Sequence, residues 1–125
     1  PASLRKLGQS AFLKCESLEE IVIPENLKEI ERDTFFECKG LKRAVIPDTV
    51  DRIQYRAFYN CPQLETISIS DRTQRVRDDH GELDIFAFSK LMDNDRCTSC
   101  GGRMKGFPFK KCTLCGKDTT PKFLK

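Results

Sequence analysis

Two pairs of cysteines near the C-terminus have the spacing of a metal site. The pairs are Cys97 with Cys100 and Cys112 with Cys115, each within a CxxC turn, and 11 residues lie between the two turns. A CxxC turn can point both of its sulfurs at one centre, and a glycine follows each turn, where a tight reversal needs a positive φ. We therefore expect these four thiolates to hold one tetrahedral Zn²⁺ per chain, with a structural role, because an all-thiolate shell leaves no position for a catalytic water.

The alternative for these four cysteines is a pair of disulfides, which would form if the chain were exported. The sequence holds seven cysteines, an odd number, and four of them have zinc spacing. Both features favour a reducing interior, so we expect a cytoplasmic location. The chain contains no run of about 18 apolar residues, and hence no membrane span is expected.

The segment that holds these four cysteines differs in charge from the rest of the chain. Residues 97–125 carry 7 Lys and Arg against 1 Asp, whereas residues 1–96 carry 15 Lys and Arg against 18 Asp and Glu. This shift predicts a boundary between a unit at 1–95 and a second unit at 96–125. The second unit resembles a zinc ribbon, and it is too small to fold without its metal.

The basic character of the second unit also suggests binding to nucleic acid. Its cations alternate with Phe107 and Phe109, a combination that could hold phosphate and stack bases. These cations are Arg103, Lys105, Lys110 and Lys111. Part of their charge would offset a zinc–thiolate centre, whose net charge is about −2. Nucleic-acid binding through the ribbon is therefore kept as the alternative function.

A repeat with a period of 23 residues runs through the first unit. Cys15, Cys38 and Cys61 follow this spacing, and the same shift aligns further apolar residues. The aligned sets are Phe12, Phe35 and Phe58; Leu18, Leu41 and Leu64; and Ile23, Ile46 and Ile69. Units of this length stack into a solenoid, each with one short strand and an irregular or short helical return, because a single unit cannot bury its apolar edge. We expect a column of aromatic rings beside a column of buried thiols.

Alternation within the repeat predicts which side chains face outward. In one strand, Ala44 and Ile46 are expected to face the core and Val45 to face outward, and Pro47 ends the strand because it cannot donate to a ladder. The same alternation in three successive strands predicts one outward face. Its residues are Glu20, Val22, Arg43, Val45, Thr66 and Ser68.

The motif of one unit can be read from residues 46–64. It consists of an Ile-Pro pair, two apolar residues three apart, an Ala-Phe pair, a cysteine and a leucine. These residues are Ile46, Pro47, Val50, Ile53, Ala57, Phe58, Cys61 and Leu64. The motif resembles the BspA-like class of bacterial leucine-rich repeats. The resemblance implies a slightly curved, parallel leucine-rich-repeat solenoid that binds other macromolecules on its concave face, often at a bacterial surface, which is the alternative location.

A degenerate closing repeat is expected between the regular repeats and the ribbon. A polar insertion is predicted at 71–81, with His80 as a solvated loop residue. After it, four residues reproduce an earlier part of the motif with the shift lengthened from 23 to 30. They are Leu83, Ala87, Phe88 and Leu91, matched to Ile53, Ala57, Phe58 and Cys61. Residues 83–92 are expected to form a helical turn or two that covers the open end of the core.

These features together favour a scaffold. Residue types for catalysis are not grouped anywhere in the sequence, so we expect neither an enzyme nor a small-molecule substrate. The outward face is mixed in charge and modest in apolar area, which suits a protein partner. We also expect metal removal to unfold 97–125 and to leave the repeats folded, since their columns do not require the ribbon.

Overall fold

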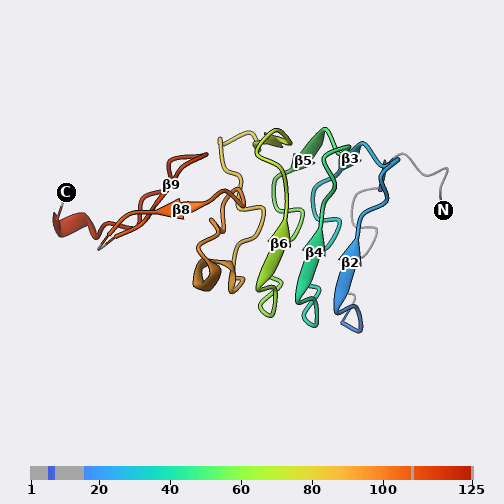
Figure 1. Cartoon of the computed structure of the whole chain (residues 1–125), viewed down its shortest axis with the longest axis horizontal. Helices are drawn as coiled ribbons and strands as arrows, with labels where there is room; N and C mark the ends of the chain where they lie inside the picture. The colour runs from blue at the N-terminus through green and yellow to red at the C-terminus, as the bar shows by residue number, and fades with distance from the viewer. Residues whose placement is uncertain (1–5, 8–15, 108, 125) are drawn as a thin grey trace.

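Short parallel strands recur on two sides of the chain, once in each turn of a solenoid (Figure 1). The computed structural model describes residues 6–7, 16–107 and 109–124. One sheet has three strands, which are β2 (Glu20–Val22), β4 (Arg43–Val45) and β6 (Thr66–Ser68). The other has four, which are β1 (Lys6–Leu7), β3 (Glu29–Ile30), β5 (Arg52–Gln54) and β7 (Gln74–Val76). Both sheets consist of strands from successive turns, as the period predicts.

The strand register reproduces the 23-residue shift. Arg43 of β4 pairs with Glu20 on one side and with Thr66 on the other. Within β4, Ala44 is buried between the exposed residues Arg43 and Val45, as the alternation predicts. The shift therefore places equivalent side chains of neighbouring turns side by side.

The core contains the two predicted columns. The rings of Phe35 and Phe58 stack with centroids 4.6 Å apart and planes 12° from parallel. Cys38 and Cys61 are fully buried beside them, and the Cys61 thiol donates to the Phe35 carbonyl oxygen over 3.1 Å. The first members of these columns, Phe12 and Cys15, lie outside the described residues.

The return segments differ from the expectation. They hold the second set of strands in place of irregular or helical turns, and in β3 and β5 a buried isoleucine follows a polar residue, as in the Arg52–Gln54 strand. After these strands, left-handed residues recur at equivalent positions. They are Asp33 (φ 58°) and Arg56 (φ 55°), followed by Glu37 (φ 55°) and Asn60 (φ 60°). A left-handed residue interrupts a helix, so the return cannot become helical.

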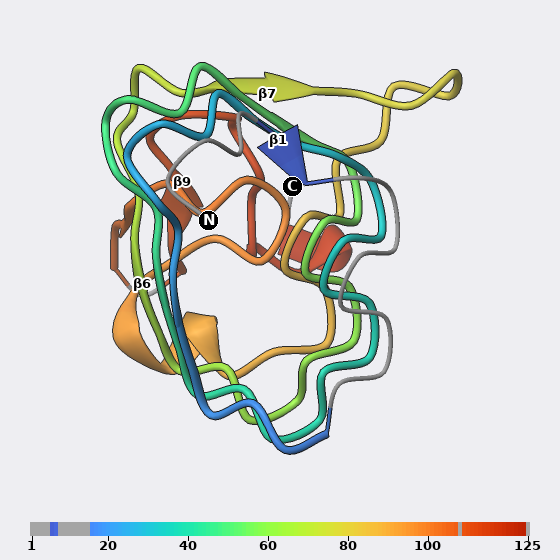
Figure 2. The same ribbon diagram turned by 90° about the vertical axis from the view of Figure 1, so that its right-hand side faces the viewer.

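The closing repeat begins earlier than the sequence predicts. Strand β7 lies inside the segment expected to be a loop, and Thr73 is buried with its hydroxyl donating to the Val50 carbonyl oxygen over 3.3 Å. Polar residues at normally apolar positions hid this strand. The loop itself follows Val76 and extends away from the body of the protein (Figure 2). His80 lies in this loop and is exposed, as expected.

The predicted offset of 30 in the closing repeat is wrong. Phe86, which is 28 residues after Phe58, continues the aromatic column with centroids 5.3 Å apart, and the Phe58 N–H donates to the Ile85 carbonyl oxygen over 2.8 Å. Phe88 is 67% exposed and meets the Tyr59 ring edge-on. The two phenylalanines lie two residues apart in a turn, where Phe88 has a left-handed φ of 64° and faces solvent, and the sequence spacing alone does not distinguish them.

Beyond the column, the described chain continues with a hairpin that lies between two 3₁₀ turns in the sequence. The turn η1 (Leu91–Asn94) buries Leu91 and is shorter than the helical segment expected at 83–92. Strands β8 (Met104–Lys105) and β9 (Lys111–Cys112) pair antiparallel, and the 3₁₀ turn η2 (Lys122–Leu124) follows.

Candidate metal centre and binding face

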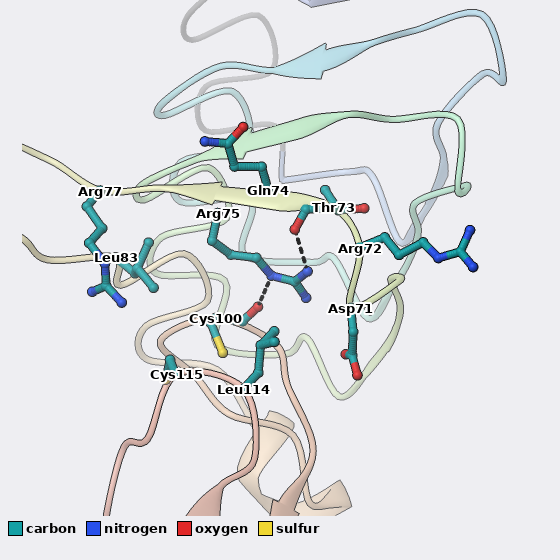
Figure 3. Close-up of a pocket in the computed structure, with 10 residues that line it drawn as sticks. All are labelled: Asp71, Arg72, Thr73, Gln74, Arg75, Arg77, Leu83, Cys100, Leu114 and Cys115. Atoms are coloured by element: carbon teal, nitrogen blue, oxygen red, sulfur yellow. Dashed lines mark hydrogen bonds between the residues drawn. The ribbon is translucent and has the colours of Figure 1, made fainter.

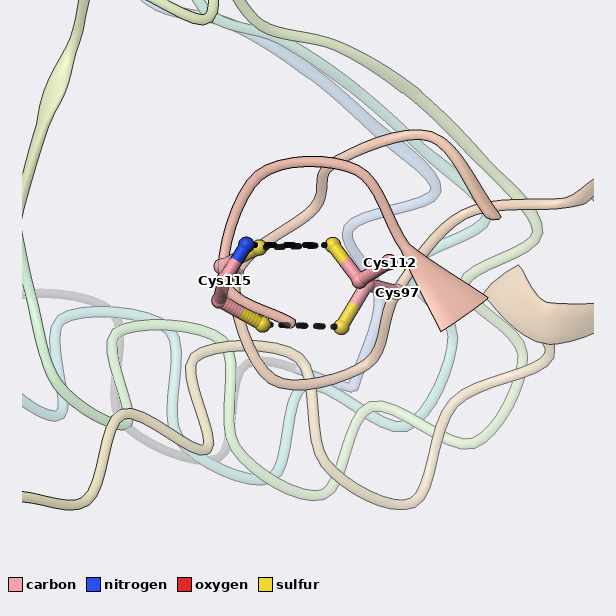
Figure 4. A group of neighbouring side chains, drawn as sticks. Cys97, Cys112 and Cys115 are labelled. Atoms are coloured by element: carbon pink, nitrogen blue, oxygen red, sulfur yellow. Dashed lines mark hydrogen bonds between the residues drawn. The ribbon is translucent and has the colours of Figure 1, made fainter. Parts of the chain in front are cut away.

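The hairpin of β8 and β9 brings the four C-terminal cysteines together (Figure 4). One cysteine turn precedes β8, and the other begins at the end of β9. All four sulfurs lie within 4.8 Å of one another. The Sγ atoms of Cys97 and Cys115 are 3.7 Å apart, and those of Cys100 and Cys112 are 3.5 Å apart. The sequence-predicted ligands thus form one cluster.

These distances fit a shared metal ion better than disulfides. Zn–S bonds of about 2.3 Å in a tetrahedron place the sulfurs about 3.8 Å apart, whereas a disulfide needs about 2.05 Å. Backbone N–H groups of the turns also point at the sulfurs, from Ser99 to Cys97 over 3.3 Å and from Gly102 to Cys100 over 3.3 Å. Such donors stabilise thiolates, which are the form that binds metal. The donor set is therefore compatible with a metal site.

The hydrogen bonds within the cluster favour deprotonation of Cys97 before the other cysteines whose pKa is raised. The pKa of Cys97 is lowered to about 5, because the Cys100 thiol and the Ser99 N–H donate to its sulfur. The pKa of Cys100 is raised, since its thiol hydrogen-bonds to Cys97 and is buried. A cation that replaced the shared protons would favour full deprotonation of these thiols.

The first cysteine turn packs directly on the last repeat. The N–H groups of Ile85 and Phe86 donate to the carbonyl oxygens of Ser99 and Thr98, over 3.0 and 2.9 Å. The buried cysteines of the cluster belong to the same apolar core as the repeats. This segment therefore covers the open end of the solenoid, and the expectation that metal removal leaves the repeats folded stays a prediction, against which these contacts count. The proposed boundary between residues 95 and 96 crosses a shared core.

The six predicted partner-binding residues lie on one sheet. All are exposed, and the register arranges them in two rows across β2, β4 and β6. The rows are Glu20, Arg43 and Thr66, and Val22, Val45 and Ser68. An ion pair joins Arg43 Nη1 to Glu20 Oε2 over 3.7 Å, and a hollow of about 300 Å³ lies beside it. We call this surface the three-strand face.

Sequence reasoning missed a pocket between β7 and the cysteine cluster (Figure 3). Its volume is about 360 Å³, and Arg75 reaches across it from β7 toward Cys100. Burial lowers the pKa of the Arg75 guanidinium, while nearby thiol groups, Cys100 foremost, act in the opposite direction. The signal that could have found this residue is its register, because Arg75 follows Ile53 by 22 residues, close to the period.

Comparison with known proteins agrees with the repeat architecture. The model of one family, described as "BspA type Leucine rich repeat region (6 copies)", matches residues 1–92. The chain belongs to this leucine-rich repeat family. Families of this kind generally act as protein-interaction scaffolds.

A solved structure is similar to this leucine-rich repeat chain. It is the crystal structure of a leucine-rich repeat protein of T. pallidum, with 32% identity and a TM-score of 0.51. The similarity covers 54% of this chain and 32% of that protein, so the matched part spans about a third of that protein's length. None of the curated proteins matches the chain. Within the described residues, every helix is too short and too polar to cross a membrane.

Proposed function

We propose that this leucine-rich repeat chain is a scaffold that binds a protein partner through the three-strand face. The observation that supports this role is the alignment of six exposed side chains from three successive strands in two rows. Val22 is 59% exposed and Val45 is 37% exposed, and the adjacent row holds the charged residues Glu20 and Arg43. A mixture of aliphatic and charged groups is typical of a protein-binding surface.

Substitution of matched arginines tests the scaffold. A partner would be captured by the immobilised protein, identified, and its affinity measured. Arg43→Glu on the three-strand face should weaken this affinity about fivefold or more, since an arginine at the centre of an interface can contribute over about 1 kcal/mol. The control is Arg52→Glu on the opposite sheet, because Arg52 is also exposed and also pairs with a glutamate, Glu29, over 3.8 Å. Equal losses in both variants would contradict the proposal.

We also propose that the cysteine cluster holds one structural zinc ion. The four clustered sulfurs would supply a complete shell of four ligands, so the ion would serve folding rather than catalysis. Elemental analysis of the purified chain should give one zinc per chain, and Cys112→Ser should lose it. A metal-free native protein, or disulfides among these cysteines found by mass spectrometry, would overturn this proposal.

Nucleic-acid binding by the ribbon is the second candidate. Phe107 is 96% exposed and Phe109 is 38% exposed, and exposed lysines such as Lys111 lie near them in the chain. Binding to DNA or RNA that falls steeply with salt and is lost in Lys111→Gln would favour this function. Retention of binding in Arg43→Glu would then exclude the three-strand face from that role.

We infer a reducing compartment, and hence the cytoplasm, from the proposed zinc–thiolate centre. Thiols that hold zinc must stay reduced, whereas an exported protein would tend to oxidise them. Titration of free thiols in protein taken directly from cells tests this location. Oxidised cysteines would favour the alternative, a bacterial cell surface or a secreted protein.

A further inference from the structure

Arg75 occupies a position that earlier turns fill with isoleucine. In the four-stranded sheet, Arg75 of β7 pairs with Ile53 of β5, and Ile53 pairs with Ile30 of β3. Both isoleucines are fully buried, and the Arg75 side chain is half-buried at the end of their row. A charged group in this place costs stability unless its surroundings supply partners.

The guanidinium of Arg75 joins the repeats to the first cysteine turn. Its Nη1 donates to the carbonyl oxygens of Ser70 and Thr73, over 2.6 and 2.7 Å, which fixes it to its own repeat. Its Nε donates to the carbonyl oxygen of Cys100 over 2.9 Å, which reaches the cluster (Figure 3). Among the described residues, its Nη2 is buried without a hydrogen-bond partner. The guanidinium therefore lies against the cysteine turn, where the thiol of Cys100 and the carboxylate of Asp71 favour its charge and one of its nitrogens has no hydrogen-bond partner.

The other two arginines of the pocket, and Arg96 outside it, do not share this role. Arg72 is exposed and points away from the cluster in Figure 3, and Arg77 donates to the Gly81 carbonyl oxygen in its own loop over 2.9 Å. Arg96 donates to the Gly101 carbonyl oxygen over 2.9 Å, but it adjoins the cysteine turn in sequence. Of these four arginines, Arg75 is thus the one that connects the repeats to the metal ligands.

We propose that Arg75 is a positioning residue for the metal centre, which fixes the Cys97–Cys100 turn on the last repeat and offsets part of the charge on the zinc–thiolate group. This inference rests on the proposed zinc site. Four thiolates and one Zn²⁺ carry a net charge of about −2, which a nearby guanidinium stabilises. Because coupling between two sites is reciprocal, the metal stabilises β7 by as much as the Arg75 contact favours metal binding.

Zinc affinity of the full chain tests the role of Arg75. Competition with a chromophoric chelator would be measured for the wild type, Arg75→Gln, Arg75→Lys and the control Arg72→Gln. Groups that support metal ligands in this way typically contribute about 10- to 100-fold in affinity, so Arg75→Gln should weaken zinc binding about tenfold or more. The zinc affinity of Arg75→Lys should lie between those of the wild type and Arg75→Gln, since lysine keeps the charge and loses the planar guanidinium. The zinc affinity of Arg72→Gln should stay within about twofold of the wild type.

Hydrogen exchange supplies a second readout. Zinc should slow exchange of the Gln74–Val76 amides in the wild type, and this protection should be lost in Arg75→Gln. If Arg75→Gln fails to fold, Arg75→Ile replaces it, because isoleucine matches the residues beside it in the sheet.

Three results would overturn the proposal. Unchanged zinc affinity in Arg75→Gln or in a folded Arg75→Ile would exclude a positioning role, while the zinc site itself would stand. Equal weakening in Arg72→Gln would indicate a general effect of charge. A wild-type chain that binds no zinc would overturn the metal centre itself, and the role of Arg75 with it.

Discussion

The aromatic column ends at Phe86, and much of the stability of the closing repeat depends on this side chain. Its ring is fully buried, with Phe58 on one side and the first cysteine turn close by on the other. A buried ring of this size contributes both transfer free energy and close packing. Phe88 contributes little to the core, because most of its surface remains in water.

Alanine substitutions at these two phenylalanines distinguish the observed register from the one expected at an offset of 30. Phe86→Ala should lower the free energy of unfolding by about 3–5 kcal/mol, since it leaves a cavity in the column. Phe88→Ala should lower it by less than about 1 kcal/mol, as for an exposed side chain. Urea denaturation of both variants measures the difference. A larger loss for Phe88→Ala would restore the offset of 30.

At the scale of elements, the two cysteine turns have the same local geometry and different surroundings. Gly101 and Gly116 follow the second cysteine of their turns and have φ values of +82° and +84°. A Cβ atom on Gly101 would lie 2.8 Å from a Phe86 ring carbon and 3.0 Å from the Ile67 methyl group, whereas one on Gly116 would meet nothing within 4 Å. The first cysteine turn therefore packs tightly on the last repeat at Gly101, and the second cysteine turn has free space at Gly116.

This contrast predicts unequal effects of the same substitution. Gly116→Ala should lower the free energy of unfolding by about 1–2 kcal/mol, because alanine disfavours the left-handed backbone of this position. Gly101→Ala should lower the free energy of unfolding by the same backbone contribution and by a further 1–3 kcal/mol or so, because the ring of Phe86 and the Ile67 side chain must shift. Thermal unfolding of the zinc-loaded protein measures both. Equal costs would mean that the first turn does not pack on the last repeat.

The elements that could be predicted from sequence are those that the 23-residue period repeats without change. The period predicts strand β4 and the Phe35–Phe58 stack directly, because the same residue types recur at the same offset. The second strands of each turn were missed, since two or three residues are too few to show a period. Strand β7 was hidden for another reason, namely that Arg75 puts a charge where the pattern requires an apolar residue, and only the cysteine turn beyond it explains that charge.

For the whole molecule, one backbone ladder runs from the repeats into the cysteine cluster. The Phe35 N–H donates to Ala57, the Phe58 N–H donates to Ile85, and the Phe86 N–H donates to Thr98. Along this ladder each described turn donates to the turn that follows it, and the cysteine segment is the last acceptor. In such arrays stability is a sum of unit and interface terms, so loss of one end is felt most by the adjoining turn.

Chelation of the metal should therefore destabilise the repeats in order from the C-terminal end. After removal of zinc with EDTA, hydrogen exchange should accelerate first at Ile85 and Phe86, whose partners lie in the cysteine turn, then at Phe58, and least at Phe35. This order follows because each amide loses its acceptor only when the next turn opens. Mass spectrometry with peptide resolution measures it. Acceleration confined to residues 97–125 would show that the repeats hold without the cysteine segment, and uniform acceleration along the chain would show that all the turns unfold as one cooperative unit.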